Sequence, residues 1–194
     1  KSIVITGAGG GFGRLVSQKT AALGARLTCA DIDAAAAEET VAAIRAAGGS
    51  ARAVRTDVSD LAQMKALARE AAEAWGTVDV MINNAGIMPL AFYADHEAAA
   101  DAWHRCIDIN FKGVLNGIIA VHDQMMAQGR GHIVNLGSVG QPRDGDPRAA
   151  WLLFDTAAGV VEHRRVPYDI AAAMQRIRDA GLPEALADRL SRGV

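Results

Sequence analysis

A glycine-rich stretch at residues 6–13, TGAGGGFG, joins a short apolar run to a segment with helical periodicity. Glycines at such a turn let the backbone bend sharply and approach a pyrophosphate closely, and the N-terminus of the following helix offers free N–H groups. A side chain with a Cβ atom would block this approach. The stretch therefore predicts a dinucleotide-binding turn, although glycine alone is common in strand-to-helix turns that bind nothing.

Short apolar runs alternate with longer helical patterns, which is typical of βαβ units that form a parallel sheet. We expect strands at residues 3–6, 26–30, 51–55, 78–82 and 132–136. Helices are expected between them: one closed by Gly24, one at residues 34–47, one capped by Ser59 or Asp60, and a long one at about 98–127. Residues 140–150 read as a loop, WLLFDTAAGVV is ambiguous between strand and buried helix, and two short helices are expected after residue 166.

The charge balance excludes several classes of partner. Lys and Arg together number 20 against 22 Asp and Glu, without a basic block, so we expect neither nucleic acid nor an anionic membrane as a partner. No apolar stretch approaches the roughly 20 residues of a membrane helix, and no signal-peptide pattern is visible. Cys29 and Cys106 show no CxxC spacing and are expected to be buried thiols of a reduced, cytoplasmic protein. We expect no metal site.

An acidic residue follows the second expected strand, in CADID. Asp31 stands about 20 residues after the glycine-rich turn, where a dinucleotide-binding fold places an acid that binds the adenosine ribose hydroxyls. It would repel a 2′-phosphate, and no Lys or Arg lies between Asp31 and Arg45 to receive one. We therefore expect NAD rather than NADP. Asp31 as a mere helix cap is the alternative, but Asp33 is the better candidate for the cap.

The spacing TGxxxGxG and four later segments resemble the short-chain dehydrogenase/reductase family over residues 2 to about 140. These segments are TDVSD, NNAG, IDINFKGVLNG and GHIVNLGSV. The resemblance implies a three-layer, doubly wound parallel sheet of the Rossmann type in a single dinucleotide-binding domain, residues 1–194. Within it we expect a Rossmann core at 1–140 and a substrate-side segment at 141–194.

The resemblance also implies roles for individual residues. Together with the acid of CADID, it implies NAD contacts at the turn, after the second strand, in TDVSD and in NNAG; the residues are Gly7, Gly11, Phe12, Gly13, Asp31, Ile32, Asp57, Val58, Asn83, Ala85 and Gly86. Ser138 and Asn110 correspond to the family's catalytic serine and asparagine, the first binding the substrate oxygen and the second supporting a proton relay. Taken one at a time, Asn83 is equally well a turn residue, Asn110 a structural polar group in a helix, and Ser138 a strand-end serine.

The chain departs from the family pattern after Ser138. The family requires a tyrosine and a lysine, YxxxK, about a dozen residues further on, whereas this chain has Trp151 followed by LLFD and no lysine after Lys112. Tyr168 lacks the lysine, and an unassisted phenol is a poor base at pH 7. The family's sixth strand and its Pro-Gly are also absent. We expect that one segment is missing between Gly140 and Val166.

Three hypotheses follow from these observations. The first is an NAD-dependent oxidoreductase that transfers hydride between the nicotinamide and a secondary alcohol or ketone. The second is a catalytically silent NAD-binding protein, such as a sensor or an assembly subunit, and the third is a truncated product that folds poorly. The resemblance also implies a homo-oligomer, a dimer or tetramer, with Val114, Ile118, Val121 and Met125 as contacts if they do not pack on their own sheet.

Overall fold

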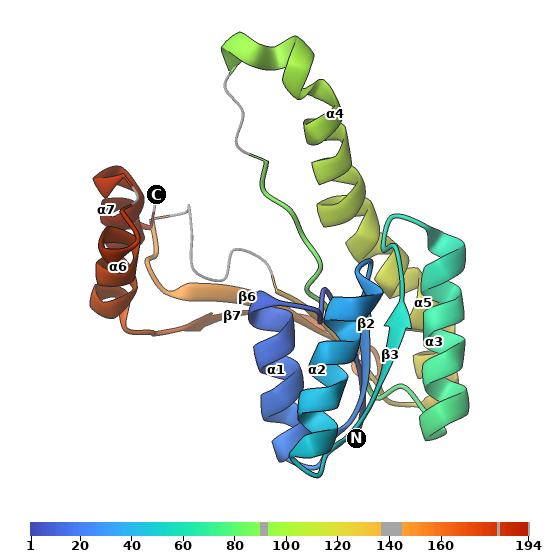
Figure 1. Cartoon of the computed structure of the whole chain (residues 1–194). Coiled ribbons are helices and arrows are strands. Elements are labelled where there is room, and N and C mark those ends of the chain that lie inside the picture. Colours follow the sequence, from blue (N-terminus) through green and yellow to red (C-terminus); the bar gives the residue numbers. More distant parts are fainter. Residues whose placement is uncertain (90–92, 137–144, 182, 194) are drawn as a thin grey trace. The chain divides into compact units, whose positions relative to one another are not determined.

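The computed structural model describes residues 1–89, 93–136, 145–181 and 183–193 (Figure 1). The chain divides into two compact units, one formed by Lys1–Val134 with Asp155–Val160 and the other by Asn135–Phe154 with Val161–Val194. All helices expected before residue 130 lie in the first unit, and so do the first three residues of the fifth expected strand. We describe each unit by itself.

The first unit alternates strands and helices. Its elements are β1 (Ser2–Thr6), α1 (Gly11–Ala22), β2 (Arg26–Asp31), α2 (Ala34–Ala46), β3 (Ser50–Arg55), α3 (Leu61–Trp75), β4 (Val80–Asn83), a 3-10 turn (Tyr93–Asp95), α4 (His96–Ile107), a π-helical turn (Asp108–Lys112), α5 (Gly113–Gln128) and β5 (His132–Asn135). The five strands and the helices between them were expected. The long helix expected at 98–127 is instead interrupted by the π-helical turn.

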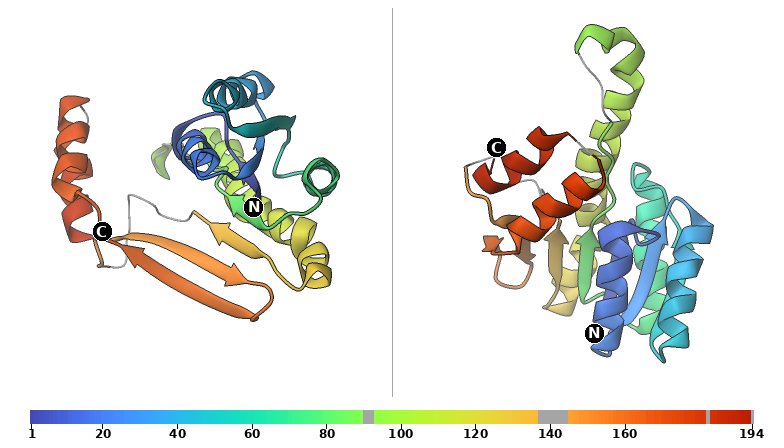
Figure 2. Two further views of the ribbon diagram at one scale, coloured as in Figure 1. Left: turned by 90° about the horizontal axis from the view of Figure 1, so that it is seen from below. Right: turned by 60° about the vertical axis from the view of Figure 1, so that its left-hand side comes forward.

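The sheet has the topology expected of a doubly wound fold. Within the first unit the strand order is β3-β2-β1-β4-β5, and β1 pairs in parallel with both β2 and β4. In register, Ile5 of β1 lies opposite Cys29 of β2 and opposite Ile82 of β4. Helices α1 and α2 cover one face of the first unit's strands and α3 and α5 the other (Figures 1 and 2). The α/β fold class is therefore confirmed.

Local signals explain where the helices begin and end. The carboxylate of Asp33 accepts hydrogen bonds from the N–H groups of Ala35 and Ala36, so Asp33 caps α2, as expected. Asp60 caps α3 in the same way. Gly76 ends α3 with φ of +81°, a left-handed conformation that glycine adopts without strain.

The core of the first unit is made by the central strand and the faces of the helices that cover it. All five residues of β1 are buried, as a strand covered on both faces must be. Asp79, next to β4, is also buried, and its Oδ2 accepts a hydrogen bond from the N–H of Ser2. Hydrogen bonds from Ser2 N–H and from Arg130 hold the pKa of Asp79 below its ordinary value, although burial, the largest single influence, acts in the opposite direction.

The second unit contains a β-hairpin and a pair of helices (Figure 2). The ambiguous apolar stretch forms β6 (Ala149–Asp155) and β7 (Val160–Val166), and the two short helices expected after it are α6 (Ile170–Asp179) and α7 (Glu184–Arg192). Arg178 of α6 donates to the carboxylate of Glu184 in α7 at 2.6 and 2.8 Å. Within the described ranges, the structure contains no helix with the length and hydropathy needed to span a membrane.

Candidate functional site

A cavity of about 430 Å³ opens at the carboxyl ends of β1, β2, β3 and β4, entirely within the first unit. After β1 the chain forms β2 on one side of that strand, and β4 later pairs with the opposite side. In doubly wound folds, ligands bind where the strand order reverses in this way, which is where this cavity lies. Its walls are formed by Gly7, Gly10, Gly11, Phe12, Asp31, Ile32, Thr56, Asp57, Val58, Asn84, Ala85, Gly86, Ile87 and Ile109.

The glycine-rich turn forms one wall, and each of its glycines meets a different requirement. Gly7 and Gly11 have φ of +66° and +47°, which side chains with a Cβ rarely adopt. Gly13 does not line the cavity, because it lies against the turn itself: a Cβ there would stand 2.0 Å from the carbonyl oxygen of Gly7. Its absence of a side chain brings α1 close to β1. Helix α1 begins at Gly11, so its free N–H groups lie at the cavity wall.

Asp31 lies at the end of β2 and lines the cavity. Its Oδ2 accepts a hydrogen bond from the N–H of Gly9 at 2.8 Å, and its Oδ1 accepts one from the N–H of Asp33 at 3.0 Å. The carboxylate therefore holds the glycine-rich turn while it faces the cavity. Ile32, which follows it, is half exposed and lines the cavity as well.

The segment after β3 brings Asp57 and Val58 to the cavity. Asp57 Oδ1 accepts hydrogen bonds from the N–H and Oγ of Ser59, at 2.9 and 2.7 Å, which fixes the turn. The carbonyl oxygen of Val58 accepts a hydrogen bond from Asn116 Nδ2 at 2.9 Å, and Gly113 lets α5 approach the Val58 side chain. Helix α5 thus supports this wall from behind.

The two asparagines after β4 have different positions. Asn83 is buried beneath Gly117 of α5 and does not line the cavity. Asn84 does, and its Nδ2 donates to the carbonyl oxygens of Thr6 and Gly7 at 2.9 and 3.1 Å. The segment that continues into Ala85 and Gly86 is therefore tied to the end of β1 by the amide of Asn84.

Asn110 lies in the π-helical turn and pairs with one backbone residue of the segment after β4. Its Oδ1 accepts from the N–H of Ile87 at 2.9 Å, and its Nδ2 donates to the carbonyl oxygen of Ile87 at 2.8 Å. The same Nδ2 approaches Cys106 Sγ at 3.4 Å. Ile87 and Ile109 line the cavity, whereas Asn110 does not line it and holds Ile87 by these two hydrogen bonds. Cys106 is half-buried, so our expectation of two buried thiols was wrong for this one.

The catalytic half of the expected site is not assembled in the residues that the structure describes. Ser138 and the start of the interval in which we expect a missing segment, up to residue 144, lie outside the described residues. Residues 149–166, where the family's Tyr–Lys helix is expected, form the β6–β7 hairpin. Burial raises the pKa of Tyr168, so still less of this phenol is ionised and able to act as a base at pH 7.

Sequence reasoning missed six residues at this site. Five line the cavity, and the sixth, Arg14, contacts the glycine-rich turn; the five are Gly10, Thr56, Asn84, Ile87 and Ile109. Each of the six adjoins a residue that the motifs did identify, so proximity in the sequence was the available signal. That signal does not show which neighbours reach the cavity, because only the fold determines this.

Comparison with known proteins places these features in a family. Residues 1–148 match the family model described as short chain dehydrogenase. Over 139 residues the chain is 41% identical to an uncharacterised oxidoreductase of Listeria monocytogenes and 40% identical to galactitol 2-dehydrogenase of Agrobacterium fabrum; these alignments cover 72% and 71% of this chain and 55% and 52% of the relatives. The chain thus spans about half the length of the curated relatives that it matches.

Solved structures agree with the sequence relatives. A short-chain dehydrogenase/reductase from Burkholderia phymatum in complex with NAD is 44% identical, with a TM-score of 0.67 over 72% of this chain and 49% of that one. Levodione reductase is 35% identical, with a TM-score of 0.66 over 72% of this chain and 54% of that one. With its glycine-rich turn, its doubly wound sheet and a family match over residues 1–148, the chain belongs to the short-chain dehydrogenase/reductase family.

Proposed function

We propose that this chain binds NAD(H) in the cavity of its first unit and serves as the cofactor-binding part of an NAD-dependent oxidoreductase. The observation that carries the proposal is the Asp31 carboxylate, which lines the cavity beside a glycine-rich turn and the N-terminus of α1. A carboxylate there accepts hydrogen bonds from ribose hydroxyls and repels a 2′-phosphate. Bound NAD would supply the hydride acceptor.

Each part of the cavity wall is assigned to one part of the cofactor. The turn at Gly7, Gly11 and Phe12, kept close to β1 by Gly13, receives the pyrophosphate on the N–H groups of α1. Asp31 and Ile32 take the adenosine ribose, and the adenine lies against Asp57 and Val58. Ala85 and Gly86, which follow Asn83 in the same segment, face the nicotinamide half. Asn110 positions this last segment through Ile87, and Ser138 binds the substrate oxygen.

The substrate class proposed is a secondary alcohol or the corresponding ketone. Two relatives support it by name: galactitol 2-dehydrogenase implies oxidation at the secondary C2 hydroxyl of a polyol, and levodione reductase implies reduction of a ketone. Hydride transfer between such a carbon and a nicotinamide also requires a proton to leave or join the oxygen. Ser138 supplies no base for this step.

The cofactor proposal is tested by measuring the dissociation constants of NADH and NADPH for the full chain by fluorescence titration. The unmodified protein is expected to favour NADH, and Asp31→Ala is expected to reduce this preference by about tenfold or more, because one carboxylate close to a phosphate dianion is removed. Asp31→Arg should invert the preference. Asp33→Ala is the matched control, since Asp33 caps α2 and does not line the cavity. Equal affinities for the two cofactors in the unmodified protein would contradict the proposal.

A second candidate function is a catalytically silent NAD(H)-binding protein. The β6–β7 hairpin favours it, because strands take the place in the sequence where the family's Tyr–Lys helix is expected. The two functions are separated by incubating the NAD-loaded protein with polyols and the NADH-loaded protein with cyclic ketones, and following absorbance at 340 nm. Turnover that falls in Ser138→Ala while NADH affinity is unchanged supports the oxidoreductase, and binding without turnover supports the silent protein.

A further inference from the structure

Arg14 joins the glycine-rich turn to α2 through a set of hydrogen bonds. Its Nη2 donates to the carbonyl oxygen of Gly9 at 2.5 Å and to Glu39 Oε2 at 3.0 Å. Its Nε donates to Thr40 Oγ1 at 3.0 Å, and Nη2 also lies 3.4 Å from the carbonyl oxygen of Ala36. The guanidinium is therefore fixed by backbone and hydroxyl acceptors as well as by the carboxylate of Glu39.

Gly9 is held from both of its ends by groups of opposite charge. Its N–H donates to Asp31 Oδ2 at 2.8 Å, and its carbonyl oxygen accepts from Arg14. The carboxylate that we assign to the adenosine ribose and the guanidinium of Arg14 thus lie on either side of a single residue. A phosphate on the 2′-oxygen of that ribose would enter the electrostatic field of both groups.

Glu39 neutralises this cation at the surface. The Arg14–Glu39 ion pair measures 3.0 Å, with side-chain exposures of 36% and 71%. An exposed ion pair of this kind contributes little to folding stability. Its main effect is on the electrostatic potential at the glycine-rich turn. Arg14 is a cation in direct contact with the turn, and the negative charge of Glu39 offsets its positive charge there.

We propose that Glu39 is a specificity-determining residue of this cofactor site: by pairing with Arg14 it withholds a fixed guanidinium from the 2′-phosphate of NADP(H). Asp31 repels that phosphate directly, and Glu39 removes the attraction that Arg14 would otherwise provide. The proposal rests on the NAD(H)-binding function proposed above and adds a determinant on α2 that does not line the cavity.

Loss of the Glu39 charge leaves Arg14 in position, since Gly9, Ala36 and Thr40 continue to accept its hydrogen bonds. The change at the site is therefore one uncompensated positive charge. Acting across several ångströms of water on a phosphate dianion, such a charge strengthens NADPH binding by about two- to fivefold at low ionic strength. The gain shrinks at 0.5 M salt because the Debye length then falls to about 4 Å.

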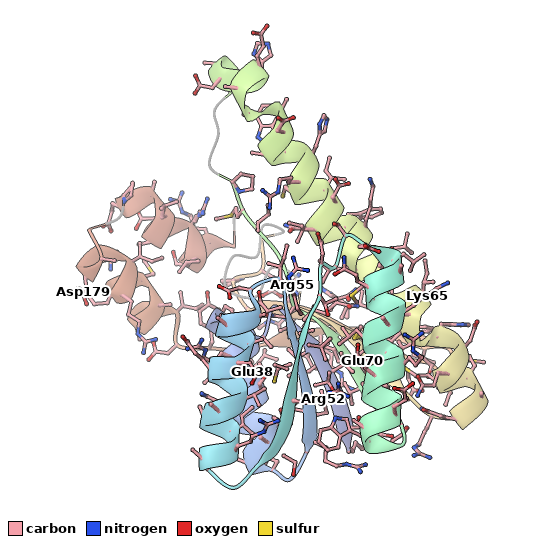
Figure 3. The ribbon with its side chains drawn as sticks, turned by 45° about the vertical axis from the view of Figure 1, so that its right-hand side comes forward. Glu38, Arg52, Arg55, Lys65, Glu70 and Asp179 are labelled. Atoms are coloured by element: carbon pink, nitrogen blue, oxygen red, sulfur yellow. The ribbon has the colours of Figure 1, made fainter. Side chains whose placement is uncertain are left out.

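The test compares Glu39→Gln with the unmodified full chain, with the ratio of the NADPH and NADH dissociation constants as the readout. We expect the ratio to fall by about two- to fivefold with NADH affinity unchanged. Two controls remove the same charge elsewhere: Glu38→Gln at the neighbouring exposed position of α2, and Glu70→Gln, which breaks the 2.8 Å ion pair with Arg52 between α3 and β3 (Figure 3). Both controls should change the ratio by less than Glu39→Gln does.

A mutant cycle decides whether Arg14 is the cause. Arg14→Gln is expected to abolish the gain, so that Arg14→Gln and the double variant Arg14→Gln/Glu39→Gln give the same ratio. Any loosening of the turn affects both cofactors and cancels in the ratio. If NADPH binds the unmodified protein too weakly to titrate, the cycle is repeated in the Asp31→Asn background, where the same fold-change is expected.

The outcomes separate this inference from the proposed function. NADH binding by the unmodified protein supports the function, and a Glu39→Gln gain that depends on Arg14 supports the inference. NADH binding together with an unchanged ratio in Glu39→Gln, or with a gain that persists without Arg14, overturns the inference and leaves the function standing. Failure of the unmodified protein to bind NADH overturns both.

Discussion

Gly13→Ala tests the packing on which the whole site depends. A Cβ at this position would stand 2.0 Å from the carbonyl oxygen of Gly7 and 2.6 Å from Asn84 Nδ2. Ordinary contacts of a Cβ begin at 3.4 Å and those under 3.0 Å essentially never occur, so α1 and the turn must separate by at least about 1 Å. The hydrogen bond from Asn84 to Gly7 lies in the path of this movement.

The expected cost follows from the two opposing effects of the new methyl group. Forcing an atom against backbone in a packed interior costs about 3 kcal/mol, the upper part of the usual range for overpacking. Alanine in place of glycine within a helix returns about 1 kcal/mol. We therefore expect the free energy of unfolding of the first unit to fall by about 2 kcal/mol and NADH affinity to fall with it.

Urea denaturation followed by circular dichroism, with hydrogen exchange at the β1 amides, reports the unit that contains Gly13. Gly86→Ala is the matched control, because its Cβ would meet Asn110 Oδ1 at an ordinary 3.4 Å and its stability should be unchanged. The packing argument is refuted if Gly13→Ala unfolds at the same urea concentration as the unmodified protein and its β1 amides exchange no faster.

Three further predictions concern other parts of the chain. Asp79→Asn is expected to lower the free energy of unfolding by about 1–2 kcal/mol at pH 7, since a charged acceptor of hydrogen bonds is lost. Folding lowers the pKa of Asp79, so its ionised form stabilises the protein above the unfolded-state pKa of about 4; the difference between the two proteins should shrink in urea titrations as the pH falls below that value. Burial raises the pKa of the Cys29 thiol, so a thiol reagent at pH 8 should modify Cys106 quickly and Cys29 only after unfolding; equal rates in the folded protein would contradict this. Phe111 is exposed on the π-helical turn. If the chain forms oligomers, Phe111→Asp should lower the molecular mass found by light scattering at micromolar concentration. If the unmodified protein is already a monomer, the prediction fails.

The surface that this last prediction uses differs from the one expected from the sequence. Val121 and Met125 are fully buried and pack within their own unit, so they are not available for contact with a second copy. The exposed large apolar side chains on this part of the chain are Ile107, Phe111, Leu115, Ile119 and Met126. Helical periodicity does not distinguish the buried apolar residues from the exposed ones, because the helix is apolar on more than one side. Only the fold determines which side packs on the sheet.

Most of the first unit could be predicted because each of its elements depends on local signals. Buried strands appear as short β-branched runs, and Asp33, Asp60 and Gly76 mark helix ends by chemistry that acts within a few residues. The glycine-rich turn and Asp31 were found because dinucleotide-binding folds impose a nearly fixed spacing between them. This spacing brings the glycine-rich turn and Asp31 together at the cavity wall.

The contacts that could not be predicted depend on residues distant in the sequence. Nothing near Asn84 indicates that its amide would bind the carbonyl oxygens of Thr6 and Gly7, 78 and 77 positions earlier. Arg14 is likewise an ordinary basic residue of an amphipathic helix until α2 places Glu39 beside it. After residue 148, where the family match ends, neither periodicity nor resemblance distinguished the β6–β7 hairpin from a helix.

Because of the π-helical turn at Asp108–Lys112, the site is more sensitive to the number of residues in this helix than to the identity of their side chains. A π turn accommodates one residue more than an α turn, and each residue of an α-helix advances the chain by about 100° around the axis. Deleting a single residue here would let α4 and α5 merge into one regular helix and would rotate everything on its N-terminal side by about that angle. Asn110 would then face away from Ile87, and the segment after β4 would lose its support although no residue that lines the cavity had changed. An insertion or deletion in this helix is therefore expected to be more damaging than any conservative replacement within it.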